Sequence, residues 1–226
     1  MSAVNIIIAI GVIVFAYLIG SLNFAVIFSK VFTGKDIRQV GSGNAGATNM
    51  LRMAGKLPAG LTFLCDALKG FVACFAGKTV FEYLFAAPEG AQVLFTPIYG
   101  AYICCIAVMV GHIFPIFFGF KGGKAVACSV GTFAVCCPIA IILGLTGFII
   151  CFIISRIVSL SSLLATVIVV GVSVADALIA TNTAYSPWPV VIMALLAGFI
   201  VFIKHTENLK RLAKGEEKKL SLKKEG

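Results

Sequence analysis

The chain has 226 residues, of which 60% are hydrophobic and 12% charged; its formal net charge is +9 and its mean hydropathy is +1.07. A soluble domain of this length needs a much larger polar fraction to cover its surface, so the composition excludes that class. The basic residues lie in short loops and a tail, so the net charge does not indicate a nucleic-acid partner. The composition predicts an all-α, polytopic membrane protein.

Seven apolar runs alternate with polar or glycine-rich segments. A hydrocarbon core of roughly 30 Å requires about 20 apolar residues per helix. We therefore expect a bundle of seven transmembrane helices in a membrane domain of residues 1–204, and a basic cytoplasmic tail, 205–226, whose residues 205–212 join the functional site. The N-terminus lacks the basic start of a signal peptide, so the first run is expected to stay as an anchor. The runs are 4–28, 57–80, 93–118, 126–135, 139–154, 160–180 and 190–203, of which the fourth and the last are short.

The charges predict the orientation. Of 18 basic residues, 16 lie in the loops around 30–56, 119–125 and 155–160 and in the tail from Lys204. The opposite loops carry acidic residues instead, namely Glu82, Glu89 and Asp176. Cytoplasmic loops of membrane proteins are enriched in Lys and Arg, so the N-terminus is predicted outside and the C-terminus in the cytoplasm.

Two groups of residues within the apolar runs are expected to be structural. The eight cysteines form no C-x-x-C pair and lie mostly in apolar sequence, so we interpret them as small hydrophobic residues and expect no metal site. Asp66 and Lys69 stand three residues apart in the second run, on one helix face. They predict an ion pair that points into the bundle and joins this helix to its neighbours.

The segment 41–49, Gly-Ser-Gly-Asn-Ala-Gly-Ala-Thr-Asn, is the most distinctive polar stretch. Its glycines and asparagines allow positive φ and bring backbone amides close to a ligand, while Arg38 and Arg52 flank it. Exposed amides beside guanidinium groups suit a phosphate, although a flexible loop would have the same composition. The segment Lys121-Gly122-Gly123-Lys124 opens the fourth run and predicts a second anion site at a helix start.

The remaining polar clusters fall on the same predicted cytoplasmic face. They include Ser21 at the end of the first run, His112 at the end of the third, and His205 with Asn208 after the last. His205 and Asn208 would share one face if the helix continued. Two cationic clusters at one face of a membrane protein suit an amphipathic, phosphorylated substrate.

Five motifs of the chain, in their order along the sequence, closely resemble those of the bacterial acyl-phosphate:glycerol-3-phosphate acyltransferases. They read G-S-L-N, D-I-R-x-x-G-S-G-N-x-G-A-T-N-x-x-R, D-x-x-K-G, G-H-x-F-P-x-F-x-x-F-K-G-G-K and H-x-x-N-L-x-R-L, across residues 20–212. The resemblance implies seven helices in the bacterial inner membrane, an active site at the cytoplasmic face, and no cofactor. It also implies transfer of a fatty acyl group from acyl phosphate to the 1-hydroxyl of glycerol-3-phosphate, which gives lysophosphatidic acid and inorganic phosphate in the first committed step of phospholipid synthesis. The implied partners are both substrates, membrane lipid and, through functional coupling, the enzyme that forms acyl phosphate.

The resemblance also assigns roles to particular residues. We expect catalytic roles for Ser21, Arg38, Lys121, His205 and Asn208. We expect phosphate binding by Gly41, Ser42, Gly43, Asn44, Gly46, Thr48, Asn49, Arg52, Gly122, Gly123 and Lys124. The chain departs from the family pattern at Ala125, where many members have glycine, and at Thr206, where arginine is frequent.

The sequence also bears on other mechanisms of acyl transfer and on a second possible function. The H-x-x-x-x-D motif of other glycerolipid acyltransferases and the G-x-S-x-G nucleophile elbow are both absent. Acyl phosphate has a good leaving group, so direct attack by the glycerol-3-phosphate hydroxyl is expected, without an acyl group resting on Ser21. His205 could serve as a general base or as a phosphate ligand, and the ligand role is favoured because glycerol-3-phosphate carries its own dianion near its hydroxyl. The alternative function is a transporter of organic phosphates, which would also need buried cations and broken helices.

Overall fold

The computed structural model describes residues 2–85, 98–179 and 186–220, and that part of the chain is helical without a strand. The described helices are α1 (Ala3–Gly20), α2 (Phe24–Thr33), α3 (Ala47–Ala54), α4 (Lys56–Leu84), α5 (Ile98–Ile113), α6 (Val126–Cys136), α7 (Pro138–Ser155), α8 (Val158–Ile179), α9 (Trp188–Lys204) and α10 (Thr206–Ala213), with 3₁₀ turns at Ile37–Gln39 and Ile116–Phe118. The all-α prediction is confirmed there. Residues 93–97 of the third apolar run, Ala180 and Glu89 lie outside the described residues.

Five described segments are long and apolar enough to cross a membrane, and α9 with α10 makes a sixth if the bent pair is one span. The sixth candidate bends by 61° at His205. The short fourth run forms α6, which has only 11 residues. A multi-pass membrane fold is therefore shown, whereas the count of seven crossings stays a prediction.

The first apolar run is divided rather than continuous. α1 ends at Gly20, and the side chain of Asn23 accepts a hydrogen bond of 3.2 Å from the amide of Val26 and so caps α2. Asn is favoured at this position because its side chain satisfies an amide that has no partner inside the helix. The break leaves Ser21 and Asn23 buried at the junction, where Ser21 Oγ accepts a hydrogen bond of 3.4 Å from the amide of Ile116.

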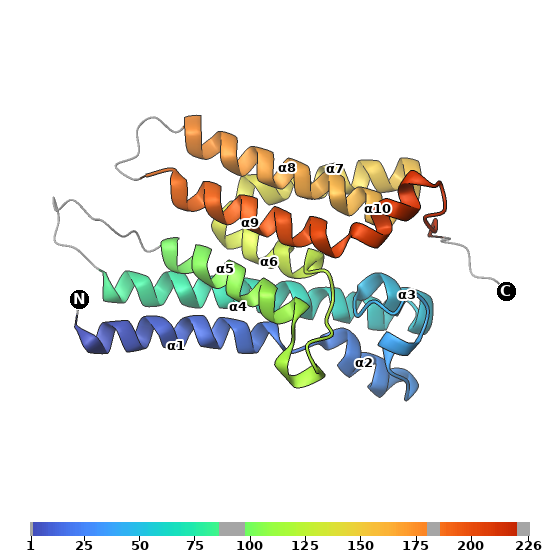
Figure 1. Cartoon of the computed structure of the whole chain (residues 1–226), viewed down its shortest axis with the longest axis horizontal. Helices are drawn as coiled ribbons and strands as arrows, with labels where there is room; N and C mark the ends of the chain where they lie inside the picture. Colours follow the sequence, from blue (N-terminus) through green and yellow to red (C-terminus); the bar gives the residue numbers. More distant parts are fainter. Residues whose placement is uncertain (1, 86–97, 180–185, 221–226) are drawn as a thin grey trace.

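Small residues bring the central helices into close contact. α4 packs against α5 and α6, α1 packs against α5, and α7 and α8 form a pair beside α9 (Figure 1). A Cβ atom on Gly131 of α6 would lie 1.7 Å from the carbonyl oxygen of Ala67, and one on Gly100 would lie 2.1 Å from that of Gly77. Such close backbone approach is typical of helices in membranes, where van der Waals packing drives association.

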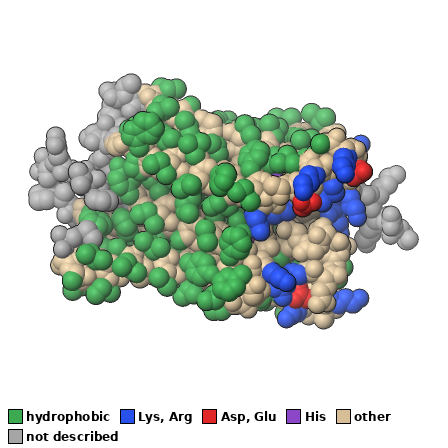
Figure 2. All heavy atoms as spheres, in the orientation of Figure 1, with side chains coloured by type: hydrophobic (Ala, Val, Ile, Leu, Met, Phe, Trp, Pro, Cys, Tyr) green, Lys and Arg blue, Asp and Glu red, His purple; other side chains and the backbone are tan. Residues whose placement is uncertain are grey.

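The surface separates apolar and charged residues. On the face shown in Figure 2, hydrophobic side chains cover most of the molecule, and Lys and Arg gather at the end that holds α2, α3 and α10. Outward-facing apolar residues such as Ile139, Ile153 and Ile154 of α7 are 60–80% exposed, as expected for a lipid-facing helix. The cytoplasmic location of the charged end remains our prediction.

The expected ion pair inside the second long helix is confirmed. Lys69 Nζ lies 2.8 Å from Asp66 Oδ1, and both side chains are buried. Lys69 also donates a hydrogen bond of 2.7 Å to the carbonyl oxygen of Leu22 at the break between α1 and α2. Through this hydrogen bond the ion pair fixes α4 to the break, so the predicted link to a neighbouring helix is present.

Candidate active site

A cavity of about 950 Å³ opens at the charged end and continues between the helices. Much of its polar lining comes from helix ends and connecting loops, and much of its apolar lining comes from inside α6, α7, α8 and α9. The expected site residues that line it are Gly41, Ser42, Gly43, Asn44, Gly46, Thr48, Asn49, Arg52, Gly122, Lys124, His205 and Asn208. Residues from both halves of the sequence therefore meet in one space, as the motifs predict.

The glycine-rich loop is shaped by its last residue. Gly41 and Gly43 have φ of +64° and +69°, which side-chain-bearing residues rarely adopt. The buried Asn49 accepts a hydrogen bond from the amide of Ser42 (3.2 Å) and donates to the carbonyl oxygens of Ile37 (3.2 Å) and Val40 (2.9 Å). Because its side-chain amide is hydrogen-bonded within the protein, Asn49 holds the loop in shape, and the other loop residues remain available to a ligand.

α3 begins at the cavity. Gly46 caps the helix without a side-chain hydrogen bond, and Ala47 and Thr48 of the first turn line the cavity. The first amides of a helix have no partner inside it and carry the positive end of the helix dipole. Arg52 lies one turn further along the same helix and also faces the cavity. This end of α3 is suited to bind a phosphate.

The Lys-Gly-Gly-Lys segment is docked onto the end of α5. The amides of Gly122 and Gly123 donate to the carbonyl oxygens of Ile113 (3.1 Å) and His112 (3.2 Å). A Cβ atom on Gly122 would lie 2.0 Å from the His112 oxygen, so glycine is required for this contact. Both amides are thus already hydrogen-bonded, which gives the glycines a docking role, and their expected anion contact stays a prediction. The segment also presents Lys124 to the cavity.

Lys124 belongs to a chain of polar contacts that closes one side of the cavity. Its ammonium group donates to Asn208 Oδ1, and Asn208 Nδ2 donates 2.7 Å to Glu217 Oε1. Glu217 also accepts hydrogen bonds from Ser159 Oγ (2.8 Å) and Arg211 Nε (2.6 Å). The C-terminal segment, α8 and the start of α6 are therefore linked through one carboxylate.

The pKa values of Lys124 and Glu217 reflect the effect of burial, which hydrogen bonds and neighbouring charges oppose. Burial lowers the pKa of Lys124 to about 8, and the Glu217 carboxylate offsets only part of that effect. Burial raises the pKa of Glu217, but hydrogen bonds from Ser159, Asn208 and Arg211 outweigh it and hold the pKa below its usual value. At neutral pH Lys124 is therefore a cation and Glu217 an anion.

His205 lies between the last residue of α9 and the first residue of α10, and its side chain is buried. Its Nδ1 lies 2.8 Å from the carbonyl oxygen of Val201, and a carbonyl only accepts, so Nδ1 carries the proton. Burial and the Lys124 ammonium lower the pKa of His205 to about 4. The ring is therefore neutral, with Nε2 as a hydrogen-bond acceptor. The helix does not continue straight, yet His205 and Asn208 both reach the cavity.

Asp66 and His112 line the inner part of the polar region. His112 Nδ1 lies 3.5 Å from Asp66 Oδ1, and both side chains are buried. A Cβ atom on Gly123 would lie 2.3 Å from His112 Nε2, so this imidazole packs directly under the Lys-Gly-Gly-Lys segment. The motif that contains Asp66 and the motif that runs from Gly111 to Lys124 are thus in contact through His112.

Four expected site residues lie off the cavity wall: Ser21, Arg38, Lys121 and Gly123. Ser21 Oγ donates 2.9 Å to the carbonyl oxygen of Tyr17, and Lys121 is exposed. Arg38 donates through Nε and Nη2 to Asp36 and through Nη1 (2.7 Å) to the carbonyl oxygen of Phe118. In this structure the Arg38 guanidinium thus joins two loops of the charged end, and its expected phosphate contact stays a prediction.

Some functional residues were missed by sequence reasoning. Glu217 stands in a charged tail nine residues after Asn208, where no local pattern distinguishes it from Glu216. The apolar lining from α7 and α8 was missed because membrane helices are apolar on every face, so no periodicity marks the side that faces a cavity. Thr206, the second departure from the family pattern, is exposed and donates 3.0 Å to the carbonyl oxygen of Ile203.

Three comparisons with known proteins all indicate the same family. A family model described as glycerol-3-phosphate acyltransferase matches residues 10–215. The glycerol-3-phosphate acyltransferase of Anaeromyxobacter sp. (strain K) is 37% identical over 205 residues, which cover 90% of this chain and 93% of that one. Crystal structures of PlsY, an integral membrane glycerol 3-phosphate acyltransferase, are also similar. The glycerol 3-phosphate form has a TM-score of 0.78 and 33% identity and covers 94% and 96% of the two chains. The lysophosphatidic acid form has a TM-score of 0.75 and 31% identity and covers 94% and 95%. The chain belongs to the glycerol-3-phosphate acyltransferase family.

Proposed function

We propose that this protein transfers a fatty acyl group from acyl phosphate to the 1-hydroxyl of glycerol-3-phosphate and releases lysophosphatidic acid and inorganic phosphate. One observation carries the proposal: a single cavity joins a cationic polar end to an apolar interior. A phosphorylated polar acceptor and a long-chain acyl donor both fit such a space, with their reacting atoms at the boundary between the two parts.

The polar end offers two places for phosphate. The first lies at the start of α3, with the glycine-rich loop and Arg52. The second lies at Lys124, which is held by Asn208 beside Arg211. The acceptor carries one phosphate and the donor another, so two anion sites are what the reaction requires. The acyl chain would extend between α6, α7, α8 and α9.

The chemistry needs little activation of the nucleophile. The hydroxyl oxygen attacks the acyl carbon and forms the ester bond, while the bond from that carbon to the phosphate oxygen breaks and its electron pair leaves with phosphate. The hydroxyl proton passes to an acceptor, for which Nε2 of the neutral His205 is suited by its tautomer. Cations at both anion sites stabilise the charge that moves onto the departing phosphate. Direct binding of phosphate by His205 would instead require a protonated Nε2.

The two PlsY structures support the proposed acceptor and product. One is described as the glycerol 3-phosphate form and the other as the lysophosphatidic acid form, and these compounds are the acceptor and the product proposed here. By the charge distribution of the sequence, the polar end would face the cytoplasm of a bacterial inner membrane. That placement would give access to glycerol-3-phosphate and to an enzyme that forms acyl phosphate.

The test uses purified, detergent-solubilised protein, in which no compartments remain. Acyl phosphate and glycerol-3-phosphate should together give lysophosphatidic acid, which a transporter of organic phosphates cannot form. Acyl-coenzyme A offered in place of acyl phosphate serves as the donor control. Absence of product with acyl phosphate from folded protein would contradict the proposal, and exchange of organic phosphates across vesicles without turnover would favour the transporter.

A further inference from the structure

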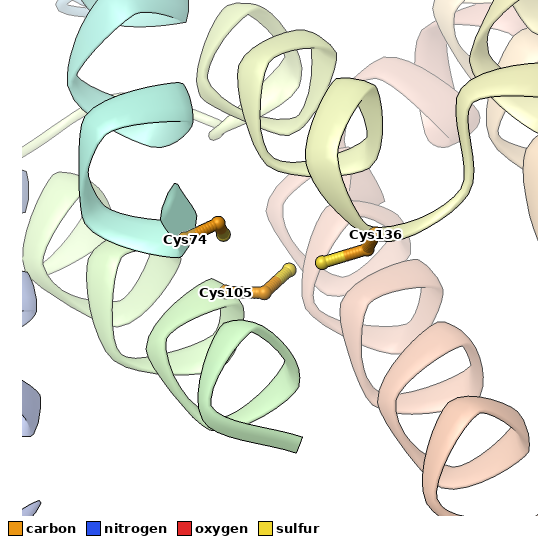
Figure 3. Close-up of side chains that lie close together, drawn as sticks. All are labelled: Cys74, Cys105 and Cys136. Atoms are coloured by element: carbon orange, nitrogen blue, oxygen red, sulfur yellow. The ribbon is translucent and has the colours of Figure 1, made fainter. Parts of the chain in front are cut away.

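Three cysteines that are distant in the sequence meet in the core of the bundle. Cys74 comes from α4, Cys105 from α5 and Cys136 from the last residue of α6, and their side chains point toward one another (Figure 3). The three Sγ atoms all lie within 4.8 Å of one another, and all three residues are buried. The sequence gives no sign of this cluster because each helix contributes one member.

A fourth sulfur atom lies beside the three thiols. Met109, one turn further along α5 and fully buried, has its Sδ 3.9 Å from Cys105 Sγ. The neighbourhood thus contains three thiols and one thioether on three helices that are held in close contact. None of the three cysteines lines the cavity, whereas Met109 does, and the acyl transfer proposed above assigns no role to any of the four residues.

The geometry fits a metal ion after small side-chain movements. With metal–sulfur bonds of about 2.3 Å, three sulfur ligands around one ion lie about 4.0 Å apart. The present sulfur atoms would therefore approach one another by at most about 0.8 Å, which rotation about χ1 can supply without movement of the helices.

The donor atoms select the class of ion. Thiolate and thioether sulfur are soft ligands that favour Cu(I), whereas Mg²⁺, Ca²⁺ and Mn²⁺ prefer oxygen. Structural zinc sites take four cysteine, histidine or carboxylate ligands, and the fourth neighbour here is a thioether. Each cysteine that ligates as a thiolate releases its proton to solvent, so two thiolates around one monovalent cation leave a net charge of −1, and three leave −2. The apolar core favours the smaller charge, so two of the cysteines would bind as thiolates and the third as a neutral thiol, with Met109 beside Cys105.

We propose that Cys74, Cys105 and Cys136, assisted by Met109, bind one soft monovalent cation of the Cu(I) class. The bound ion would join the end of α6 to α4 and α5. α6 also supplies Phe133 to the cavity wall, so the ion would hold one wall of the cavity in place. The proposed metal site does not depend on the proposed reaction or on its substrates.

The test titrates the full chain in detergent with Ag(I), a redox-inert probe for Cu(I), in the presence of excess free methionine as a competing ligand. Metal bound per chain is measured by mass spectrometry after removal of free ion. We compare the wild type with Cys105→Ala and with the matched variant Cys128→Ala, which removes an equally buried cysteine outside the cluster. Cys105→Ala should bind one ion fewer than the wild type, whereas Cys128→Ala should bind as many.

A second variant isolates the cluster. In a chain whose other five cysteines (Cys65, Cys104, Cys128, Cys137 and Cys151) are replaced by alanine, one Ag(I) should still bind, and X-ray absorption should show a first shell of sulfur only. The ion should also raise the unfolding temperature of the wild type and of Cys128→Ala, but not that of Cys105→Ala. Equal metal content and equal thermal shifts in Cys105→Ala and Cys128→Ala would overturn the proposal.

Discussion

Ala125 has φ of +62° at the residue that caps α6, in the left-handed region. A Cβ atom in this conformation crowds the following carbonyl oxygen, at a cost of roughly 1–2 kcal/mol that glycine avoids. The glycine that the family pattern leads us to expect at this position would avoid that cost. Ala125 follows Lys124 directly, so its strained backbone sets the direction in which the ammonium group enters the cavity.

Replacement of Ala125 by glycine should therefore raise stability or leave it unchanged. Relief of the left-handed strain exceeds or balances the roughly 0.5–1 kcal/mol that glycine costs through the entropy of the unfolded chain. The measurement is the thermal unfolding midpoint in detergent. Ala134→Gly, at an exposed site inside the same helix, is the control and should lose about 1 kcal/mol. A lower midpoint for Ala125→Gly than for Ala134→Gly would contradict the explanation.

The protonation of Lys124 should limit activity at high pH. Because its pKa is lowered to about 8, the cationic form is present below that pH and is lost above it. The value of kcat/KM for glycerol-3-phosphate should therefore fall as the pH rises through about 8, since this ratio reports the free enzyme. In Lys124→Arg, which stays charged, any remaining activity should lack this decline. An identical upper limb in both proteins would assign the decline to another group.

Glu217 is a positioning residue in this account, because it holds Asn208 and Arg211 and does not itself need to touch the substrate. Glu217→Gln keeps the shape but removes the charge, and hydrogen bonds to charged groups contribute about 1.5–3 kcal/mol. We expect kcat/KM to fall by roughly tenfold to a hundredfold. The adjacent Glu216→Gln, at an exposed site, should have no effect. Equal activity of the two variants would show that the Glu217 contacts do not support the site.

At the scale of the helices, breaks place polar groups at the boundary of the apolar core. α9 ends at Lys204, directly before His205, and α6 begins at Val126, two residues after Lys124, so His205 and Lys124 reach the cavity from helix ends. α7 and α8 line the cavity with side chains from their interiors, including Ile141 and Val170. Lys124 and His205 thus lie at helix ends, and the interiors of α7 and α8 form apolar parts of the cavity wall.

The helix interiors should set the length of the acyl chain that is accepted. Val170 lines the cavity twelve residues after the start of α8, which corresponds to about 18 Å of helix rise. Val170→Phe should reduce kcat/KM for long-chain acyl phosphates more than for short-chain ones, because the added ring occupies space that only a long chain reaches. Val167→Phe, at a site 55% exposed and outside the cavity, is the matched control. A uniform loss across chain lengths would contradict this account of the cavity.

Across the whole molecule, the sequence predicts helices and motifs better than it predicts contacts. Apolar runs and charged loops were enough for the membrane class, and the glycine-rich loop, Lys124 and His205 meet in one cavity as expected. Hydropathy could not show the break at Asn23, because one capping side chain decides it. It also could not show that Glu217 joins the site or that three cysteines converge, because those contacts depend on how separate helices pack.

The central claim is that one cavity couples loss of phosphate from the donor to acylation of glycerol-3-phosphate. The most direct measurement quantifies inorganic phosphate and lysophosphatidic acid in the same reaction of purified protein. We predict that the two products form in equal amounts and that both are absent when glycerol-3-phosphate is omitted. Phosphate release that is independent of glycerol-3-phosphate, or lysophosphatidic acid formed without an equal amount of phosphate, would contradict the account.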